Sequence, residues 1–188
     1  MPYQKTEING VFLFTPNVFG DSRGDFYESF RSDQTLLETG LQFQVAQVNN
    51  SVSSKGVLRG IHFKETPPGQ QKFVSVTSGA IIDVAIDLRR SSPTFKKWQA
   101  FQLNEENRHS LLIGNGIGHA FLSLREETKV TYLCDSVFEP EKEHGISPLS
   151  AGIDWQQLAS RFGMSEFLLS DRDRNAPRLD EAESILFP

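Results

Sequence analysis

Ala80-Ile81-Ile82-Asp83-Val84-Ala85-Ile86-Asp87-Leu88 is the stretch that decides the fold. Its even-numbered residues from Ile82 to Leu88 are aliphatic and fall on one face, whereas Asp83 and Asp87 fall on the other. This period of two predicts a β-strand. A second strand pattern, Phe73–Thr77, precedes it across Ser78-Gly79, which is a turn signal.

Outward from this stretch, similar short patterns recur with polar, Gly or Pro links, which predicts an antiparallel β-sandwich or barrel. The further expected strands are Gly10–Phe14, Phe26–Phe30, Phe43–Val48, Val57–Phe63, Trp98–Leu103, Ser110–Ile113, Ala120–Leu124 and Lys129–Cys134. Only Ser32–Glu38 and Ile153–Phe162 suggest short helices. We expect residues 1–188 to form one domain, with the charged tail Ser170–Pro188 wrapping the surface or padding one end.

Composition excludes several function classes. The formal net charge is −5 and the basic residues are scattered, which disfavours a nucleic-acid partner. No apolar run has the ~18 residues of a membrane span, and the N-terminus lacks the apolar core of a signal peptide. The single cysteine, Cys134, cannot form an internal disulfide. These features predict a protein of the reducing cytoplasm.

Three segments combine Gly with Arg or His in strand-like surroundings: Gly20–Glu28, Val57–Phe63 and Gly114–Phe121. In the second, strict alternation would place Leu58, Gly60 and His62 on one face and Arg59, Ile61 and Phe63 on the other. A Gly beside a strand His leaves room for a ligand. Spacing alone is equally compatible with a core histidine bonded to a backbone carbonyl and with a functional one.

A metal site is a weaker interpretation. Gly-x-Gly-x-x-His at 114–119 resembles the second half of a cupin metal signature. The first half offers only His62, followed by Phe63 and Lys64, so two histidines lack a clear third ligand. We therefore expect no bound metal.

Single residues elsewhere are ambiguous when taken alone. Lys72 is compatible with a solvated lysine, and Tyr132 with a half-buried aromatic whose hydroxyl is satisfied. Arg23 and Glu28 are compatible with a surface ion pair of small energetic value.

Several motifs in order across nearly the whole chain resemble the dTDP-4-dehydrorhamnose 3,5-epimerase family. They are Val18–Gly24, Gln47-x-Asn49-x-Ser51, Arg59–Phe63, Ser91–Phe95, Gly118–Phe121, Ala151–Trp155 and Leu169–Pro177. The resemblance implies an all-β, cupin-like antiparallel β-sandwich (jelly roll) with a few short helices. It implies a homodimer without metal or organic cofactor, whose substrate is a nucleotide sugar, a dTDP-4-keto-6-deoxyhexose.

The resemblance also implies roles for individual residues. His62 matches the catalytic base, Asp173 the acid paired with it, Tyr132 the proton donor on the other sugar face, and Lys72 the lysine near the ketone oxygen. The substrate-binding matches are Arg23 for the diphosphate, Arg59 and His119 for the sugar and diphosphate region, Phe26 and Glu28 for the base (expected from the neighbouring subunit), and Gln47 and Asn49 for the nucleotide pocket.

The chemistry explains these residue types. A proton next to a ketone is weakly acidic, so removing it needs a placed base, which neutral imidazole provides. A cation at Lys72 would stabilise the enolate oxygen, and a phenol would return a proton to the opposite face. Because C3 and C5 flank the same C4 ketone, one enolate-stabilising site can serve both carbons.

Four positions depart from the family pattern. Phe138 stands where a second active-site Tyr is common, Lys64 replaces a usual Gln, and Ser75 and Leu112 replace Arg and Trp of many members. We expect epimerisation at C3, C5 or both in deoxysugar biosynthesis, with the altered pocket wall, and Phe138 above all, favouring one carbon (a 3- or 5-monoepimerase). The alternatives are a non-catalytic nucleotide-sugar-binding cupin and a metal-dependent cupin oxygenase.

Overall fold

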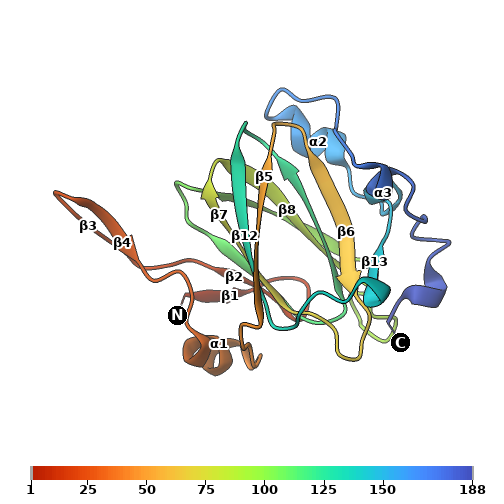
Figure 1. The fold of residues 1–188 in the computed structure, drawn as a ribbon, viewed down its shortest axis with the longest axis horizontal. Helices are drawn as coiled ribbons and strands as arrows, with labels where there is room; N and C mark the ends of the chain where they lie inside the picture. Colours follow the sequence, from red (N-terminus) through yellow and green to blue (C-terminus); the bar gives the residue numbers. More distant parts are fainter. Residues whose placement is uncertain (1, 188) are drawn as a thin grey trace.

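Two antiparallel sheets face each other in the computed structural model, which describes residues 2–187 (Figure 1). The six-stranded sheet has the order β1-β2-β10-β7-β12-β5. Its strands are Tyr3–Lys5, Val11–Phe14, Ser110–Ile113, Lys72–Ser78, Thr128–Cys134 and Gln47–Ser53. The five-stranded sheet has the order β13-β6-β11-β8-β9. Its strands are Glu143–Gly145, Leu58–Lys64, Ile117–Ser123, Ala80–Asp87 and Trp98–Asn104. The predicted cupin-like β-sandwich is confirmed.

Residues Ala80–Asp87 form strand β8 as predicted, and both of its faces are buried. Ile82, Val84 and Ile86 belong to an apolar cluster on the outer side of the five-stranded sheet. Ile81 and Ala85 instead pack with Val74 and other residues of the opposite sheet in the core between the two sheets. Asp83 points into this second layer, where it finds a histidine partner described below. The aliphatic face therefore needs a cover, and the C-terminal part of the chain supplies it.

That cover consists of short helices and irregular chain. Helices α2 (Trp155–Ser160) and α3 (Asp171–Arg174) run along the outer side of the five-stranded sheet (Figure 1). Buried residues from this segment that join the outer cluster include Trp155, Leu179 and Phe187. The expectation that the charged tail pads the surface is confirmed, because its residues Leu179, Ala182, Leu186 and Phe187 are buried in this outer cluster.

Most predicted helices and strands occur in the structure, but several begin or end at different residues. The helix expected over Ser32–Glu38 is α1, Ser32–Thr39. The helix expected over Ile153–Phe162 is shorter, because the Asp154 carboxylate accepts a hydrogen bond from the Gln157 amide and thereby caps its start. Three 3₁₀ turns also occur, at Pro140–Lys142, Pro148–Ser150 and Glu183–Ile185.

Two predicted strands begin and end at other residues than expected. The strand expected over Phe43–Val48 begins only at Gln47, because Phe43 packs in a separate cluster with Phe12 and Phe73. The strand expected over Phe26–Phe30 is β4, Gly24–Tyr27, which pairs with β3, Val18–Asp21. This hairpin projects from the sandwich (Figure 1). The aromatic residues of the segment did not predict that it would stand away from the core. None of the described helices is both long and apolar enough to cross a membrane.

Candidate active site

A cavity of about 290 Å³ lies between the two sheets, and both sheets contribute side chains to it. The five-stranded sheet provides Arg59, His62, His119, Phe121 and Glu143. The six-stranded sheet provides Asn49, Asn50, Ser51, Lys72, Tyr132 and Cys134. Gln70, Phe138 and Arg172 complete the wall from outside the strands, Arg172 from α3. Most of the residues singled out in the sequence therefore meet in one place.

A β-bulge in β6 brings Arg59 and His62 to the same side. His62 pairs with His119 and Arg59 with Phe121, so Gly60 and Ile61 both lie opposite the single residue Ala120. The strict alternation predicted from the sequence was therefore wrong here. Gly60 has a φ of +116°, and a Cβ on it would lie 2.6 Å from the Cβ of Ala120. Glycine is required at this point, and the bulge turns Arg59 into the cavity.

His62 is held by a carboxylate from the C-terminal segment. Its Nε2–H donates to Asp173 Oδ1 at 2.6 Å, and the Gly60 amide donates to Asp173 Oδ2 at 3.4 Å. Burial alone would raise the pKa of the Asp173 carboxyl, but the hydrogen bond and charge of His62, with help from Gly60 and Ser170, hold it below its usual value. The ionised carboxylate fixes the tautomer that leaves a lone pair on His62 Nδ1.

Helix α3 positions this carboxylate. Ser170 caps the helix, because its side-chain oxygen accepts a hydrogen bond from the Asp173 amide at 3.1 Å. Asp173 is buried although the other three residues of the four-residue helix are exposed. The charged motif Ser170–Arg174 thus forms a short helix that points the Asp173 carboxylate at His62 of β6.

A second histidine–carboxylate pair lies beside the first. His119 Nε2–H donates to Asp83 Oδ1 at 2.6 Å, and both side chains are almost fully buried. Asp83 Oδ2 has no hydrogen-bond partner among residues 2–187. The acid in the middle of β8 that helped to identify the strand therefore orients a histidine of the site. Its signal in the sequence was an Asp within an otherwise aliphatic run.

Lys72 and Tyr132 stand on the opposite wall, on neighbouring strands of the six-stranded sheet. Burial lowers the pKa of the Lys72 ammonium below its ordinary value, although the charges of Cys134, Glu143 and Asp83 work in the other direction. Burial raises the pKa of the Tyr132 phenol, against the effect of its 3.1 Å hydrogen bond with Ser51. The wall therefore carries a cation that gives up its proton more readily than usual and a phenol that stays protonated.

Two polar residues that were given no role from the sequence add to this site. Glu143 lines the cavity from β13, and its buried Oε1 has no hydrogen-bond partner within the described chain. Ser51 bonds to Tyr132. Glu143 lies in a three-residue strand outside every quoted motif, so no local pattern pointed to it.

The nucleotide-pocket candidates are only partly assembled. Asn49 lines the cavity, and its Oδ1 accepts a hydrogen bond from Gln47 Nε2 at 2.9 Å. Gln47 Oε1 in turn accepts from the Phe138 amide at 2.8 Å. Phe138 lines the cavity, but the other three departures from the family pattern do not: Lys64 is buried behind it, Ser75 borders a separate hollow and Leu112 is fully buried in the phenylalanine-rich cluster. The pocket wall is thus altered only at Phe138.

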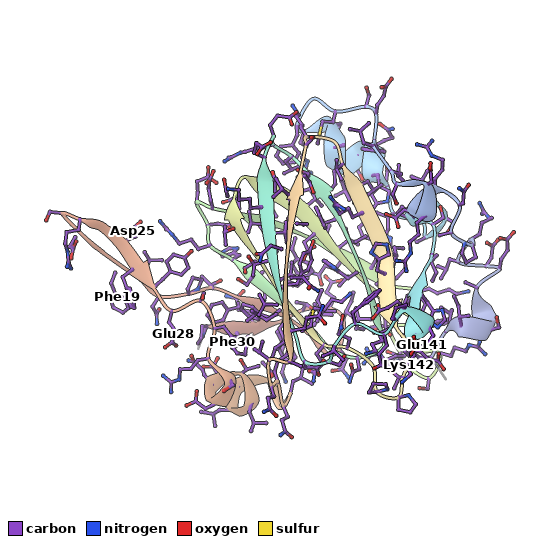
Figure 2. All side chains as sticks on the ribbon, in the orientation of Figure 1. Phe19, Asp25, Glu28, Phe30, Glu141 and Lys142 are labelled. Atoms are coloured by element: carbon purple, nitrogen blue, oxygen red, sulfur yellow. The ribbon has the colours of Figure 1, made fainter. Side chains whose placement is uncertain are left out.

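Arg23, Phe26 and Glu28 lie outside this cavity. Arg23 is almost fully exposed and pairs with Asp21 on the projecting hairpin. Phe26 and Glu28 border a different hollow, together with Phe19. Figure 2 shows Phe19 and Glu28 on and beside the hairpin, away from the sandwich. Within one chain the structure does not bring these three residues to His62.

The metal interpretation finds no cluster to support it. Among the side chains that the structure describes, no group of three or more His, Cys, Asp or Glu residues is arranged to hold a metal ion. Both cavity histidines already use one ring nitrogen on a carboxylate.

Comparisons with known proteins agree with this geometry. Residues 5–181 match the family model described as dTDP-4-dehydrorhamnose 3,5-epimerase. The dTDP-4-dehydrorhamnose 3,5-epimerase of Mycolicibacterium smegmatis is 42% identical over 184 residues, which cover 98% of this chain and 89% of the relative. The structure of the rmlC epimerase of Mycobacterium tuberculosis superposes with a TM-score of 0.94 at 35% identity, covering 100% of this chain and 94% of that one.

A relative that acts on one carbon is similarly close. ChmJ, a 3'-monoepimerase from Streptomyces bikiniensis solved with dTDP-quinovose, has a TM-score of 0.89 and 40% identity, covering 96% of this chain and 90% of that one. Both types of relative share the fold, so fold similarity does not separate them. On the family match, the identities and the coverage, this chain belongs to the dTDP-4-dehydrorhamnose 3,5-epimerase family.

Proposed function

We propose that this chain epimerises a dTDP-4-keto-6-deoxyhexose at C3, C5 or both, in deoxysugar biosynthesis. One observation carries the proposal. His62, bonded to the buried Asp173, stands on one wall of a cavity whose opposite wall carries Lys72 and Tyr132. A base and a proton donor on opposing sheets can act on opposite faces of a sugar ring held between them.

The steps follow from these positions. His62 Nδ1 takes the proton next to the ketone, and the Asp173 carboxylate stabilises the imidazolium that forms. The Lys72 ammonium stabilises the charge that develops on the ketone oxygen. The protonated Tyr132 phenol then delivers a proton to the other face, which inverts the carbon. No organic cofactor or metal enters this scheme.

The rest of the cavity suits a sugar diphosphate. Arg59 offers a guanidinium for charge-assisted bonds to phosphate, and His119 lines the same cavity from its position opposite His62 on the neighbouring strand. The unpaired oxygen of Glu143 offers an acceptor for a sugar hydroxyl. These groups favour catalysis on a bound nucleotide sugar over mere binding, since binding alone does not call for the His62–Asp173 pair.

Phe138 bears on how many carbons react. A phenylalanine cannot donate a hydrogen bond or a proton where a tyrosine would. We therefore propose that it changes how the sugar lies or how the proton returns, so that one of C3 and C5 reacts faster.

Deuterium exchange tests the activity directly. The purified protein is incubated with dTDP-4-keto-6-deoxyglucose in deuterated water, and NMR follows deuterium entry at C3 and at C5. The protein should place deuterium on carbon next to the ketone. We expect faster entry at one carbon. Equal, rapid entry at both would contradict the single-carbon proposal alone. Binding with no exchange at either carbon would overturn the enzymatic proposal in favour of a non-catalytic binding protein.

We further propose that the protein is a homodimer in which each hairpin completes the partner's site. The hairpin of β3 and β4 exposes 67% of Phe19 and 72% of Phe26, which is costly for a free surface. It also carries Arg23 away from its own cavity. A second copy that receives the hairpin would bury both rings and bring Arg23, Phe26 and Glu28 to a nucleotide. Sedimentation equilibrium should give a dimer, and a monomer at micromolar concentration would contradict this.

We also propose that the protein works in a reducing cytoplasm, which the single cysteine, buried in the sheet, supports.

A further inference from the structure

A buried lysine that the proposed chemistry does not use lies two residues after His62. Lys64 ends strand β6, and no part of its side chain is exposed. Its Nζ donates to the Val137 carbonyl at 2.7 Å, to Glu139 Oε1 at 2.8 Å and to Ser136 Oγ at 3.4 Å. Burying an ammonium is costly unless it is paired and hydrogen-bonded, and here all its partners come from one short segment.

That segment, 136–139, carries Phe138 into the cavity. It has no helix or strand of its own, so its shape depends on contacts with neighbouring elements. Gln47 Oε1 accepts from the Phe138 amide at 2.8 Å, and Gln70 Nε2 donates to the Ser136 carbonyl at 2.9 Å. Of these contacts, those of Lys64 alone involve a buried charge, and they fall on both sides of Phe138.

We propose that Lys64 is a positioning residue that fixes where the Phe138 ring stands in the cavity. The inference rests on the proposed function, because it assigns Lys64 to the control of substrate placement in that site. Lys64 is not among the residues that line the cavity, so it acts through Phe138. Displacing the ring by about 1 Å changes the fit of the sugar nucleotide while the His62–Asp173 pair stays in place.

The test compares three variants with the wild type. Lys64→Met keeps an unbranched chain and removes the ammonium. We expect KM to rise about 10-fold, the ratio of deuterium entry at C3 and C5 to change, and kcat to change less than KM. Lys64→Arg, which restores a buried cation with several donors, should recover part of the wild-type ratio. Lys142→Met is the matched control, because the Lys142 ammonium also pairs with Glu139 but its side chain is partly exposed to solvent. It should behave like the wild type.

A double-mutant cycle separates positioning from general support of the fold. If Lys64 acts through Phe138, then Lys64→Met should add little to the effect of Phe138→Ala on KM and on the carbon ratio. Additive effects, or a folded Lys64→Met with wild-type KM and ratio, would overturn the inference. If Lys64→Met does not fold, Lys64→Gln, which keeps an uncharged donor on a side chain one bond shorter, takes its place in the cycle.

A binding measurement keeps this test independent of turnover. dTDP-glucose has a hydroxyl at C4 in place of the ketone and cannot be epimerised by this route. Its affinity, measured by calorimetry, should fall by a similar factor in Lys64→Met and Phe138→Ala, and no further in the double variant. If the wild type exchanges no deuterium but this pattern holds, the proposed activity fails while the positioning role of Lys64 stands. If exchange occurs but the pattern is absent, only the Lys64 inference fails.

Discussion

Replacing His62 by asparagine is expected to lower kcat by about 10²- to 10⁴-fold, the usual contribution of a placed general base. Asparagine keeps a polar side chain of smaller size but cannot accept the substrate proton. Because His62 is used mainly once the substrate is bound, KM should change less than kcat. Steady-state rates of product formation measure both quantities.

The matched control for this variant is His144→Asn. His144 stands on β13, which pairs with β6, but it is not among the residues that line the cavity; it approaches Glu65 at 3.4 Å instead. It should keep wild-type kcat. A similar loss in both variants would mean that the substitutions act on the fold, and unchanged kcat in His62→Asn would remove His62 from the mechanism.

Replacing Lys72 by methionine is expected to lower kcat by about 10²- to 10³-fold, which is typical for the loss of one donor to a developing oxyanion. Methionine fills much of the same volume and is well tolerated in a buried position. The exposed Lys129 on neighbouring β12 supplies the control, and Lys129→Met should be unaffected. Retention of wild-type kcat in Lys72→Met would exclude enolate stabilisation by this residue.

The same lysine predicts a pH dependence. Burial lowers the pKa of Lys72, so the group loses its proton at a lower pH than an exposed lysine. Since only the ammonium stabilises an enolate, kcat should fall as the pH rises through this lowered pKa, while Tyr132, with its raised pKa, remains protonated. The kcat–pH profile of the wild type should therefore have an alkaline decline that Lys72→Met lacks.

The architecture could be predicted from the sequence where one local rule decided it. Alternation in Ala80–Asp87 identified a strand because its faces are chemically different. Alternation failed at Gly60, since the bulge depends on the close approach of Ala120 from a strand about sixty residues away. The start of β5 was misplaced for a similar reason, because Phe43 is an aromatic residue of a loop that packs against another part of the core.

The residues of the candidate site likewise fall into those that the sequence identified and those that it did not. His62, Lys72, Tyr132 and Asp173 were identified through motif resemblance. The structure places the first three around one cavity and bonds Asp173 to His62. Glu143 was missed because a lone acid in a three-residue strand resembles a solvated surface residue. Arg23, Phe26 and Glu28 were predicted to bind the substrate, yet within a single chain they lie on and beside a hairpin that projects from the sandwich, apart from His62.

The initial rate of solvent deuterium entry into the keto sugar measures removal of the proton next to the ketone, the step that we assign to His62, and it does not require inversion. The comparison is between wild type, His62→Asn and Tyr132→Phe, each at saturating dTDP-4-keto-6-deoxyglucose. We expect the exchange rate of His62→Asn to fall about 10²- to 10⁴-fold, whereas Tyr132→Phe still exchanges but forms little epimer. Exchange by His62→Asn at the wild-type rate would contradict the role of His62 as the base.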